Sequence, residues 1–175
     1  YEIPLPEQDI AKSEDEAAAI ANRIGYPVIL KVSSAQILHK TDVGGLMAHL
    51  LTEQDVRNAY NTIFRNVHAH FSSLDTHPQP LTPDIRGILV QKFLPAGNEF
   101  IIGAVRDPSF GPLVMVGLGG IYTELLGDTA FRIAPIDEHE GYAMLQELLA
   151  WKILLGMRGK EQSDIDGLCR VIAQV

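Results

Sequence analysis

The hydrophobic pattern of the chain changes near residue 93, and this change limits the possible folds more than any other feature. Before it, capped amphipathic helices alternate with short apolar strands, whereas after it several short strands follow one another across tight turns. Such a chain is expected to form a mixed α/β (α+β) fold with two lobes that share a cleft. We place the first lobe at residues 1–93, with a linker segment at residues 1–12, and the second lobe at residues 94–175.

Capping signals and apolar spacing predict the elements of the first half. Ser13 and Glu16 form a capping box, and Gly25 is placed to end the helix that they open. The other elements expected here are strands at residues 26–32 and 46–51, a loop at 34–45, a helix opened by Thr52 and Asp55, and a surface loop at 72–84.

Three strands are expected next, at residues 86–93, 98–106 and 112–117. The turn-forming residues 107–111 between the last two predict an antiparallel hairpin. A glycine-rich run at 117–127 comes next, and the remaining elements expected are a strand at 130–134, a helix from Asp137 to about Trp151, and a helix opened by Ser163 and Asp166.

Composition excludes several classes of function. The net charge of −8 argues against non-specific nucleic-acid binding, which depends on Lys and Arg neutralising backbone phosphates. The single cysteine, Cys169, rules out an intrachain disulfide and fits a reducing, cytoplasmic compartment. No apolar run approaches the roughly 20 residues of a transmembrane helix. The chain begins at Tyr1 with neither an initiator Met nor a signal peptide, so we expect a cytoplasmic fragment or excised domain with no membrane partner.

Lys31 is the first candidate for chemistry, because it lies within the apolar strand YPVILKV. An ammonium there costs desolvation energy unless it meets an anion. A phosphate or an internal carboxylate would serve, and a lysine at a strand end can also reach solvent. Arg132, within the apolar strand expected at 130–134, raises the same question more weakly.

The loop that contains His39, Lys40, Gly44 and Gly45 is the second candidate. A glycine-rich backbone can approach a phosphate and present its N–H groups, and Lys40 adds positive charge. His39 is the only side chain in this loop suited to act as a nucleophile near neutral pH. Taken alone, such a loop is also compatible with an ordinary turn.

Two further stretches carry candidate ligands. After Gln91, a strand runs into a short connection whose backbone could read an adenine edge, and Glu99 could accept from ribose hydroxyls. In the glycine run, Glu124 could bind a metal or orient His39. An ordinary connection with a surface glutamate, and a flexible loop with one solvated acid, are the respective alternatives. The remaining histidines show no metal-ligand spacing, so no zinc site is expected.

Four strings in the sequence resemble one known family: VILKV, ILHKTDVGG, GILVQKFLPAGNEFIIGAVRDPSFGPLVMVGLGG and AFRIAPI. They are similar to the ATP-grasp domain of the ADP-forming (NDP-forming) acyl-CoA synthetases, of the acetate–CoA ligase (ADP-forming) β-subunit type, in the succinyl-CoA synthetase superfamily. The resemblance covers nearly the whole chain, to about Arg158 and Gly159. It implies an ATP-grasp fold with the nucleotide cleft between its two lobes.

The resemblance assigns roles to the candidate residues. It implies that Lys31 contacts the ATP phosphates, that His39 carries a phosphoryl group, and that Glu99 is the ribose-binding acid. Gln91 stands where succinyl-CoA synthetase has an acid, a change that is tolerable if the contact with adenine is mainly through the backbone. The other implied positions are Leu38 and Lys40 in the loop over the phosphates, and Gln91 and Leu94 at the adenine hinge.

The implied reaction is acyl-CoA + ADP + phosphate ⇌ acid + CoA + ATP, through an acyl phosphate and phosphohistidine intermediates. A first phosphohistidine would lie in a CoA-ligase domain that this chain lacks, and His39 would pass its phosphoryl group to ADP. The implied cofactors are ATP/ADP and Mg2+, whereas CoA and phosphate would bind mainly to the absent domains.

The resemblance also implies that the second lobe is incomplete and the fold truncated at its C-terminus. The family continues beyond residue 175 into strands that hold magnesium, so no metal site is expected within this chain. The implied partner is a CoA-binding/ligase domain or an α-subunit, in a homo- or hetero-oligomer.

Two other interpretations compete with an acid–CoA ligase (ADP-forming). Bacterial protein lysine acetyltransferases carry a similar synthetase-like region as a regulatory or oligomerisation module. The presence of Lys31, His39 and Glu99 favours the catalytic version. A succinyl-CoA synthetase β-chain fits least well, because LHKTDVGG is not its pattern.

Overall fold

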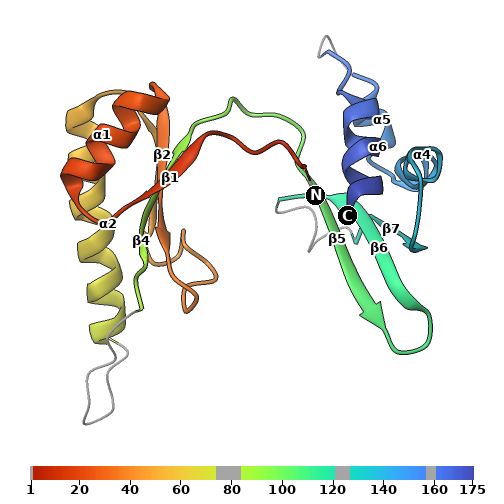
Figure 1. Ribbon diagram of the computed structural model, residues 1–175, viewed down its shortest axis with the longest axis horizontal. Helices are drawn as coiled ribbons and strands as arrows, with labels where there is room; N and C mark the ends of the chain where they lie inside the picture. The colour runs from red at the N-terminus through yellow and green to blue at the C-terminus, as the bar shows by residue number, and fades with distance from the viewer. Residues whose placement is uncertain (1, 74–83, 121–126, 157–160) are drawn as a thin grey trace. The chain divides into compact units, whose positions relative to one another are not determined.

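The computed structural model describes residues 2–73, 84–120, 127–156 and 161–175 (Figure 1). The chain divides into two compact units, one formed by Leu5–Pro95 and the other by Ala96–Val175 together with Tyr1–Pro4. Among the described residues, no helix is long and apolar enough to cross a membrane.

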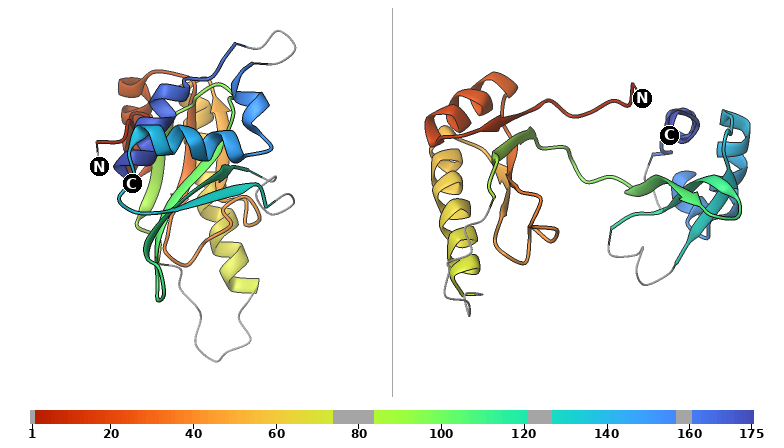
Figure 2. Two further views of the ribbon diagram at one scale, coloured as in Figure 1. Left: turned by 90° about the vertical axis from the view of Figure 1, so that its right-hand side faces the viewer. Right: turned by 60° about the horizontal axis from the view of Figure 1, so that its bottom comes forward.

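The unit Leu5–Pro95 is an antiparallel sheet with two helices on one of its faces (Figures 1 and 2). Its strand order is β1-β4-β2-β3, and each neighbouring pair is antiparallel. The elements are β1 (Gln8–Ala11), α1 (Glu14–Ile24), β2 (Val28–Ser33), β3 (Leu46–Leu50), α2 (Glu53–Ser73) and β4 (Gly87–Lys92).

The predicted caps of both helices are confirmed. The Ser13 hydroxyl accepts from the Glu16 amide at 3.2 Å, while the Glu16 carboxylate accepts from the amide of Lys12 instead of that of Ser13. At α2, the Thr52 hydroxyl accepts from the Asp55 amide at 3.1 Å, and Asp55 accepts from the Thr52 amide at 3.0 Å. Each cap satisfies amides that lack a partner within the helix, so both helices begin where the sequence predicts.

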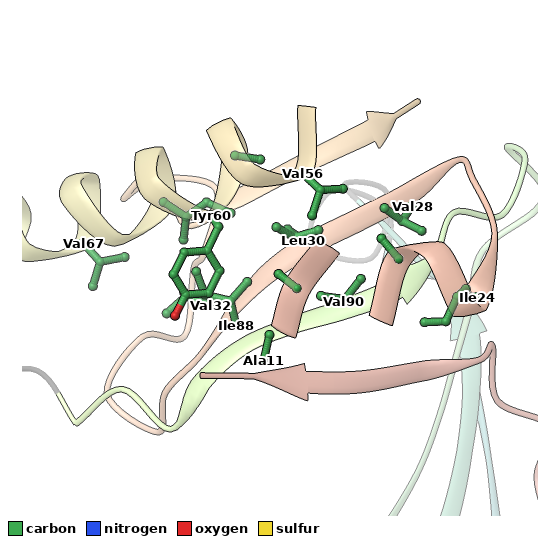
Figure 3. Close-up of a cluster of buried hydrophobic side chains, with 14 of the residues drawn as sticks. Ala11, Ile24, Val28, Leu30, Val32, Val56, Tyr60, Val67, Ile88 and Val90 are labelled. Carbon is green, nitrogen blue, oxygen red and sulfur yellow. The ribbon is translucent and has the colours of Figure 1, made fainter. Parts of the chain in front are cut away.

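Alternation along β2 separates the core from the opposite face of the sheet. Val28, Leu30 and Val32 are buried under α1 and α2, as Figure 3 shows, and they pack with helix residues such as Val56 and Ile63. The residues between them are half-buried on the face that has no helix, and Lys31 is one of these. One strand therefore supplies both the core and a lysine outside it.

The N-terminal segment interpreted as a linker contains a strand, which corrects that expectation. β1 pairs with β4 in a register that sets Gln8 opposite Gln91 and Ala11 opposite Ile88. Only Ala11 of its four residues is buried, so β1 lacks the apolar alternation by which the other strands were predicted. The backbone ladder to β4 holds it in the sheet.

The unit Ala96–Val175 contains a second antiparallel sheet, of order β5-β6-β7. The predicted hairpin is confirmed, because β5 and β6 pair across a turn in which the Asp107 carboxylate accepts from the amides of Ser109 and Phe110. Helix α4 packs against α6 and contacts β6 and β7 (Figure 1). The elements are β5 (Phe100–Asp107), β6 (Gly111–Leu118), β7 (Thr129–Ile133), α4 (Glu138–Glu147), α5 (Trp151–Leu154) and α6 (Ile165–Gln174).

Two helix boundaries differ from the prediction. The helix expected to reach Trp151 ends at Glu147, because the buried carboxylate of Asp128 accepts from the amides of Leu149 and Ala150 at 2.8 and 2.9 Å. These two amides are therefore bonded outside a helix, and Trp151 starts the separate helix α5. The last helix is capped by Asp164, one residue after the predicted Ser163, through the amide of Gly167.

Replacing Asp128 with Ala is expected to destabilise this unit. The change leaves two amides without an acceptor near a buried position, and we expect the free energy of unfolding to fall by about 2–4 kcal/mol. Trp151 is the only tryptophan and lies next to Ala150, so its fluorescence during urea unfolding reports on this unit.

The exposed Glu161 gives a matched control, since Glu161→Ala also removes a carboxylate. Its urea midpoint should stay close to that of the wild type. Equal midpoints for Asp128→Ala and wild type would contradict the role assigned to Asp128.

Candidate functional site

A pocket of about 500 Å³ lies on the face of the first sheet that has no helix. Lys31 of β2, Leu89 of β4 and Leu46 of β3 form part of its wall. Strand pairing brings them together, because Lys31 lies opposite Leu46 on one side and opposite Leu89 on the other. The pocket floor is therefore sheet, and its position follows from strand register.

Positive charge lines this pocket. Lys31, Lys40 and Arg86 contribute side chains, and no Asp or Glu is among the described residues that line it. The polar residues Ser33 and Ser34 also belong to the wall. Three cations with no acid beside them attract an anion with several charges, such as a chain of phosphates.

Lys31 is a partly buried cation of this set. Its Nζ donates to the side-chain oxygen of Gln91 at 2.6 Å. Desolvation by burial, and secondly the positive charge of Lys40, lower the pKa of Lys31 below its ordinary value. Gln91 is neutral, so the charge of the ammonium is hydrogen-bonded without being cancelled.

The glycine pair closes the loop at residues 34–45 against β2. The Gly45 amide donates to the Lys40 carbonyl at 2.7 Å, and the Gly45 carbonyl accepts from the Val32 amide at 2.8 Å. A Cβ on Gly45 would lie 2.7 Å from Cγ1 of Val32, so a larger residue would push the loop off the strand. Gly44 has a φ of 61°, a conformation that glycine adopts without strain. This closure holds Lys40 at the pocket.

His39 lies between two residues of the pocket wall, Leu38 and Lys40. Its side chain is exposed, and no described residue forms a hydrogen bond or an ion pair with it. Leu38 is 83% exposed although it is apolar. The imidazole is thus accessible beside a cationic pocket, where a nucleophile for a phosphoryl group is useful.

The two residues expected at the adenine hinge differ in their surroundings. The Gln91 side chain is engaged within the sheet, between Lys31 and Gln8. Leu94 lies in the segment between β4 and β5 and is 58% exposed.

Glu99 lies in the other unit, beside a second pocket of about 390 Å³. Its carbonyl accepts from the Gly119 amide at 2.7 Å, and a Cβ on Gly119 would lie 2.9 Å from the backbone of Glu99. A Cβ on Gly120 would lie 3.0 Å from the Glu99 carboxylate. The first glycines of the run therefore allow its backbone to lie against Glu99, with Leu118 and Ile153 as apolar wall. Glu124 falls outside the described residues.

Arg132 proves to have an internal partner. Its guanidinium forms an ion pair with Glu147 of α4, which lowers the pKa of that carboxyl through hydrogen bonding. The anion expected to compensate a cation within an apolar strand is therefore, for Arg132, a carboxylate of the same unit.

Arg86 is the pocket cation that sequence reasoning missed, with Ser33 and Ser34 beside it. Arg86 precedes β4, and its amide donates to the Ser33 carbonyl at 2.8 Å, which sets the start of β4 beside the end of β2. The position of Arg86 at the pocket could have been predicted only by pairing the strands expected at residues 26–32 and 86–93 in the antiparallel register that the structure has.

The parts of the chain described by the structure contain no group of three or more His, Cys, Asp or Glu side chains that could hold a metal ion.

Comparisons with known proteins agree on one family. The ATP-grasp domain family profile matches residues 1–175. The subunit beta of acetate–CoA ligase (ADP-forming) I of Pyrococcus furiosus is 39% identical over 175 residues, which are 100% of this chain and 72% of that protein. Acetate–CoA ligase (ADP-forming) I of Archaeoglobus fulgidus is 42% identical over 175 residues, again 100% of this chain but only 24% of that protein.

A solved structure shows the same fold. Acetyl-coenzyme A synthetase 1 of Ca. Korarchaeum cryptofilum, crystallised with coenzyme A and Ca-AMPCP, matches with a TM-score of 0.90 and 44% identity, over 98% of this chain and 71% of that chain. The same synthetase with coenzyme A and Mg-AMPPCP has its phosphohistidine segment pointing towards the nucleotide-binding site, and matches with a TM-score of 0.80 and 39% identity, over 99% of this chain and 70% of that chain.

These findings confirm the predicted ATP-grasp fold class, and nothing in them supports the lysine acetyltransferase alternative. The chain spans 72% of the P. furiosus β subunit but 24% of the A. fulgidus ligase, as expected of a part that works with further domains. The chain belongs to the ATP-grasp domain family, in the branch formed by the ADP-forming acyl-CoA ligases.

Proposed function

We propose that this chain is the nucleotide-binding part of an ADP-forming acyl-CoA synthetase and that it passes a phosphoryl group between a phosphohistidine and ADP. The overall reaction is acyl-CoA + ADP + phosphate ⇌ acid + CoA + ATP. The observation that carries the proposal is the pocket lined by Lys31, Lys40 and Arg86, with no acid among its described lining residues.

In this proposal, Lys31 and Lys40 bind the phosphates of the nucleotide. Both lysines line one pocket, and the pKa of Lys31 is lowered by desolvation and by Lys40. A phosphate between them relieves both effects, because it supplies an anion to a partly buried ammonium and separates two like charges. Gly44 and Gly45 keep the loop at the pocket.

His39 is the proposed phosphocarrier. An imidazole nitrogen attacks phosphorus, so that a new P–N bond forms while the P–N bond to the first phosphohistidine, on the partner domain, breaks. An oxygen of the ADP β-phosphate then attacks the same phosphorus, and the bond to His39 breaks as ATP forms. The exposed position of His39 beside Lys40 supports this role, because positive charge stabilises the transferring phosphoryl group.

Three further residues are proposed to contact the nucleotide. Glu99 is the proposed acceptor for the ribose hydroxyls, in a pocket whose apolar wall includes Leu118 and Ile153. Gln91 and Leu94 are the proposed hinge residues for adenine. Mg2+ belongs to the proposed reaction, and no step is assigned to it.

The proposed partner is a CoA-binding/ligase domain or α-subunit, which would supply the acyl-CoA site and the first phosphohistidine. The P. furiosus relative is itself a β subunit. We place the complete enzyme in the cytoplasm, as a homo- or hetero-oligomer.

Removing the charge of Lys31 is expected to weaken nucleotide binding. Lys31→Met keeps the aliphatic stem but loses a charged hydrogen bond to phosphate, so the dissociation constant for ADP should rise by about tenfold to a hundredfold. Calorimetric titration of the chain with ADP measures the change. Lys152→Met removes the same charge from an exposed lysine of α5 and should bind ADP like the wild type. Equal affinities of the two variants for ADP would show that Lys31 does not bind the nucleotide phosphates.

Loss of His39 is expected to abolish phosphoryl transfer while leaving ADP binding intact. The assay supplies labelled phosphate, acetyl-CoA and Mg2+ to the complete synthetase and follows acid-labile label on this segment. Label should appear on the wild type and on His139→Ala, which changes an exposed histidine of α4, and should be absent from His39→Ala. Equal labelling of all three proteins would disprove the carrier role.

A further inference from the structure

Three neighbouring strands are joined by a chain of side-chain hydrogen bonds on the face that has the cationic pocket. Lys31 of β2 donates to Oε1 of Gln91 of β4 at 2.6 Å. Nε2 of Gln91 in turn donates to Oε1 of Gln8 of β1 at 2.7 Å. Strand register makes this possible, because Gln91 lies opposite Gln8 in one pairing and opposite Ile29, two residues before Lys31, in the other.

The direction of these hydrogen bonds is fixed by chemistry. An ammonium has three donors and no acceptor, so Gln91 must turn its oxygen toward Lys31. The NH2 group of Gln91 then points to the opposite side, and Gln8 must offer an oxygen to receive it. If the amide of Gln91 turned over, its NH2 group would face the ammonium and two donors would meet.

We propose that Gln8 is a positioning residue for the phosphate-binding lysine, acting through Gln91. By accepting from Nε2 of Gln91, Gln8 keeps the Gln91 oxygen turned toward Lys31 and so holds the ammonium at the floor of the pocket. This inference rests on the proposed function, in which Lys31 meets a nucleotide phosphate.

The surroundings of Lys31 give this chain of bonds its importance. The other charged residues that line the pocket, Lys40 and Arg86, are both cations, and no described acid lines it. The pKa of Lys31 is already lowered by burial and by Lys40, so losing the Gln91 oxygen would disfavour the ammonium further. A neutral acceptor supports the ammonium and leaves its charge available to an anion.

Gln8 can be changed with little effect on the fold. Its side chain is exposed, and β1 is held by its backbone ladder to β4 and by the buried Ala11. Substitutions at Gln8 therefore test its influence on Lys31 and not the integrity of the core.

The test compares Gln8→Leu, Gln8→Glu and Gln8→Lys in the full chain. Leu offers no hydrogen bond, Glu only accepts in its ionised form, and Lys only donates. Two quantities are measured: the pKa of Lys31 by NMR without nucleotide, and the dissociation constant for ADP by calorimetry.

With Gln8→Leu, we expect the pKa of Lys31 to fall and ADP to bind about threefold to tenfold more weakly. Gln8→Glu should restore binding close to that of the wild type, whereas Gln8→Lys should be at least as weak as Gln8→Leu. Simple attraction of ADP predicts the reverse order, with Lys binding more tightly than Glu, so the order separates positioning from charge. In a Lys31→Met background, Gln8→Leu should have no further effect.

Two results would overturn the positioning role: a Lys31 pKa that Gln8→Leu leaves unchanged, or affinities that follow the charge at position 8. A Lys31 pKa that falls while ADP affinity stays constant would support the link from Gln8 to Lys31, and would instead contradict the proposed contact between Lys31 and phosphate. The failures of the two proposals are thereby distinguishable.

Discussion

The candidate phosphate pocket depends on the hydrogen bond of 2.6 Å from the Lys31 ammonium to the neutral amide oxygen of Gln91. A carboxylate in place of the amide would neutralise the lysine and compete with any anion in the pocket. Because the partner is neutral and the other cations in the pocket are Lys40 and Arg86, positive charge accumulates where the loop closed by Gly45 approaches β2. An anionic ligand relieves this accumulation, and the nucleotide phosphates required by the ATP-grasp family are such a ligand.

This arrangement depends on the two-residue period of the strands. Leu30 and Val32 fix β2 to the helices through the core (Figure 3). Strand alternation consequently places Lys31, which lies between them, on the other face of the sheet. A shift of register by one residue would exchange core and site. The core therefore stabilises the fold and also determines which side chains reach the pocket.

Much of the fold could be predicted from the sequence, because its signals are local. Ser13 and Thr52 predict where their helices begin, and the turn residues around Asp107 predict the hairpin. The features missed depend on partners distant in the chain. Asp128 ends a helix that begins ten residues later, β1 has a single buried residue, and Arg86 reaches the pocket only through the pairing of β4 with β2. Lys31 and His39 could be proposed as candidates from the sequence because a lysine in an apolar strand and a histidine in a glycine-rich loop are unusual. Gln8 and its hydrogen bond to Gln91 could not be predicted without the strand register.

The most direct test of the central claim is a crystal structure of the chain with a non-hydrolysable ATP analogue and Mg2+. We expect phosphate oxygens within hydrogen-bonding distance of Nζ of Lys31 and of Lys40, and the imidazole of His39 close to the terminal phosphate. A nucleotide whose phosphates lie away from this pocket, with Lys31 still bonded to Gln91 alone, would contradict it.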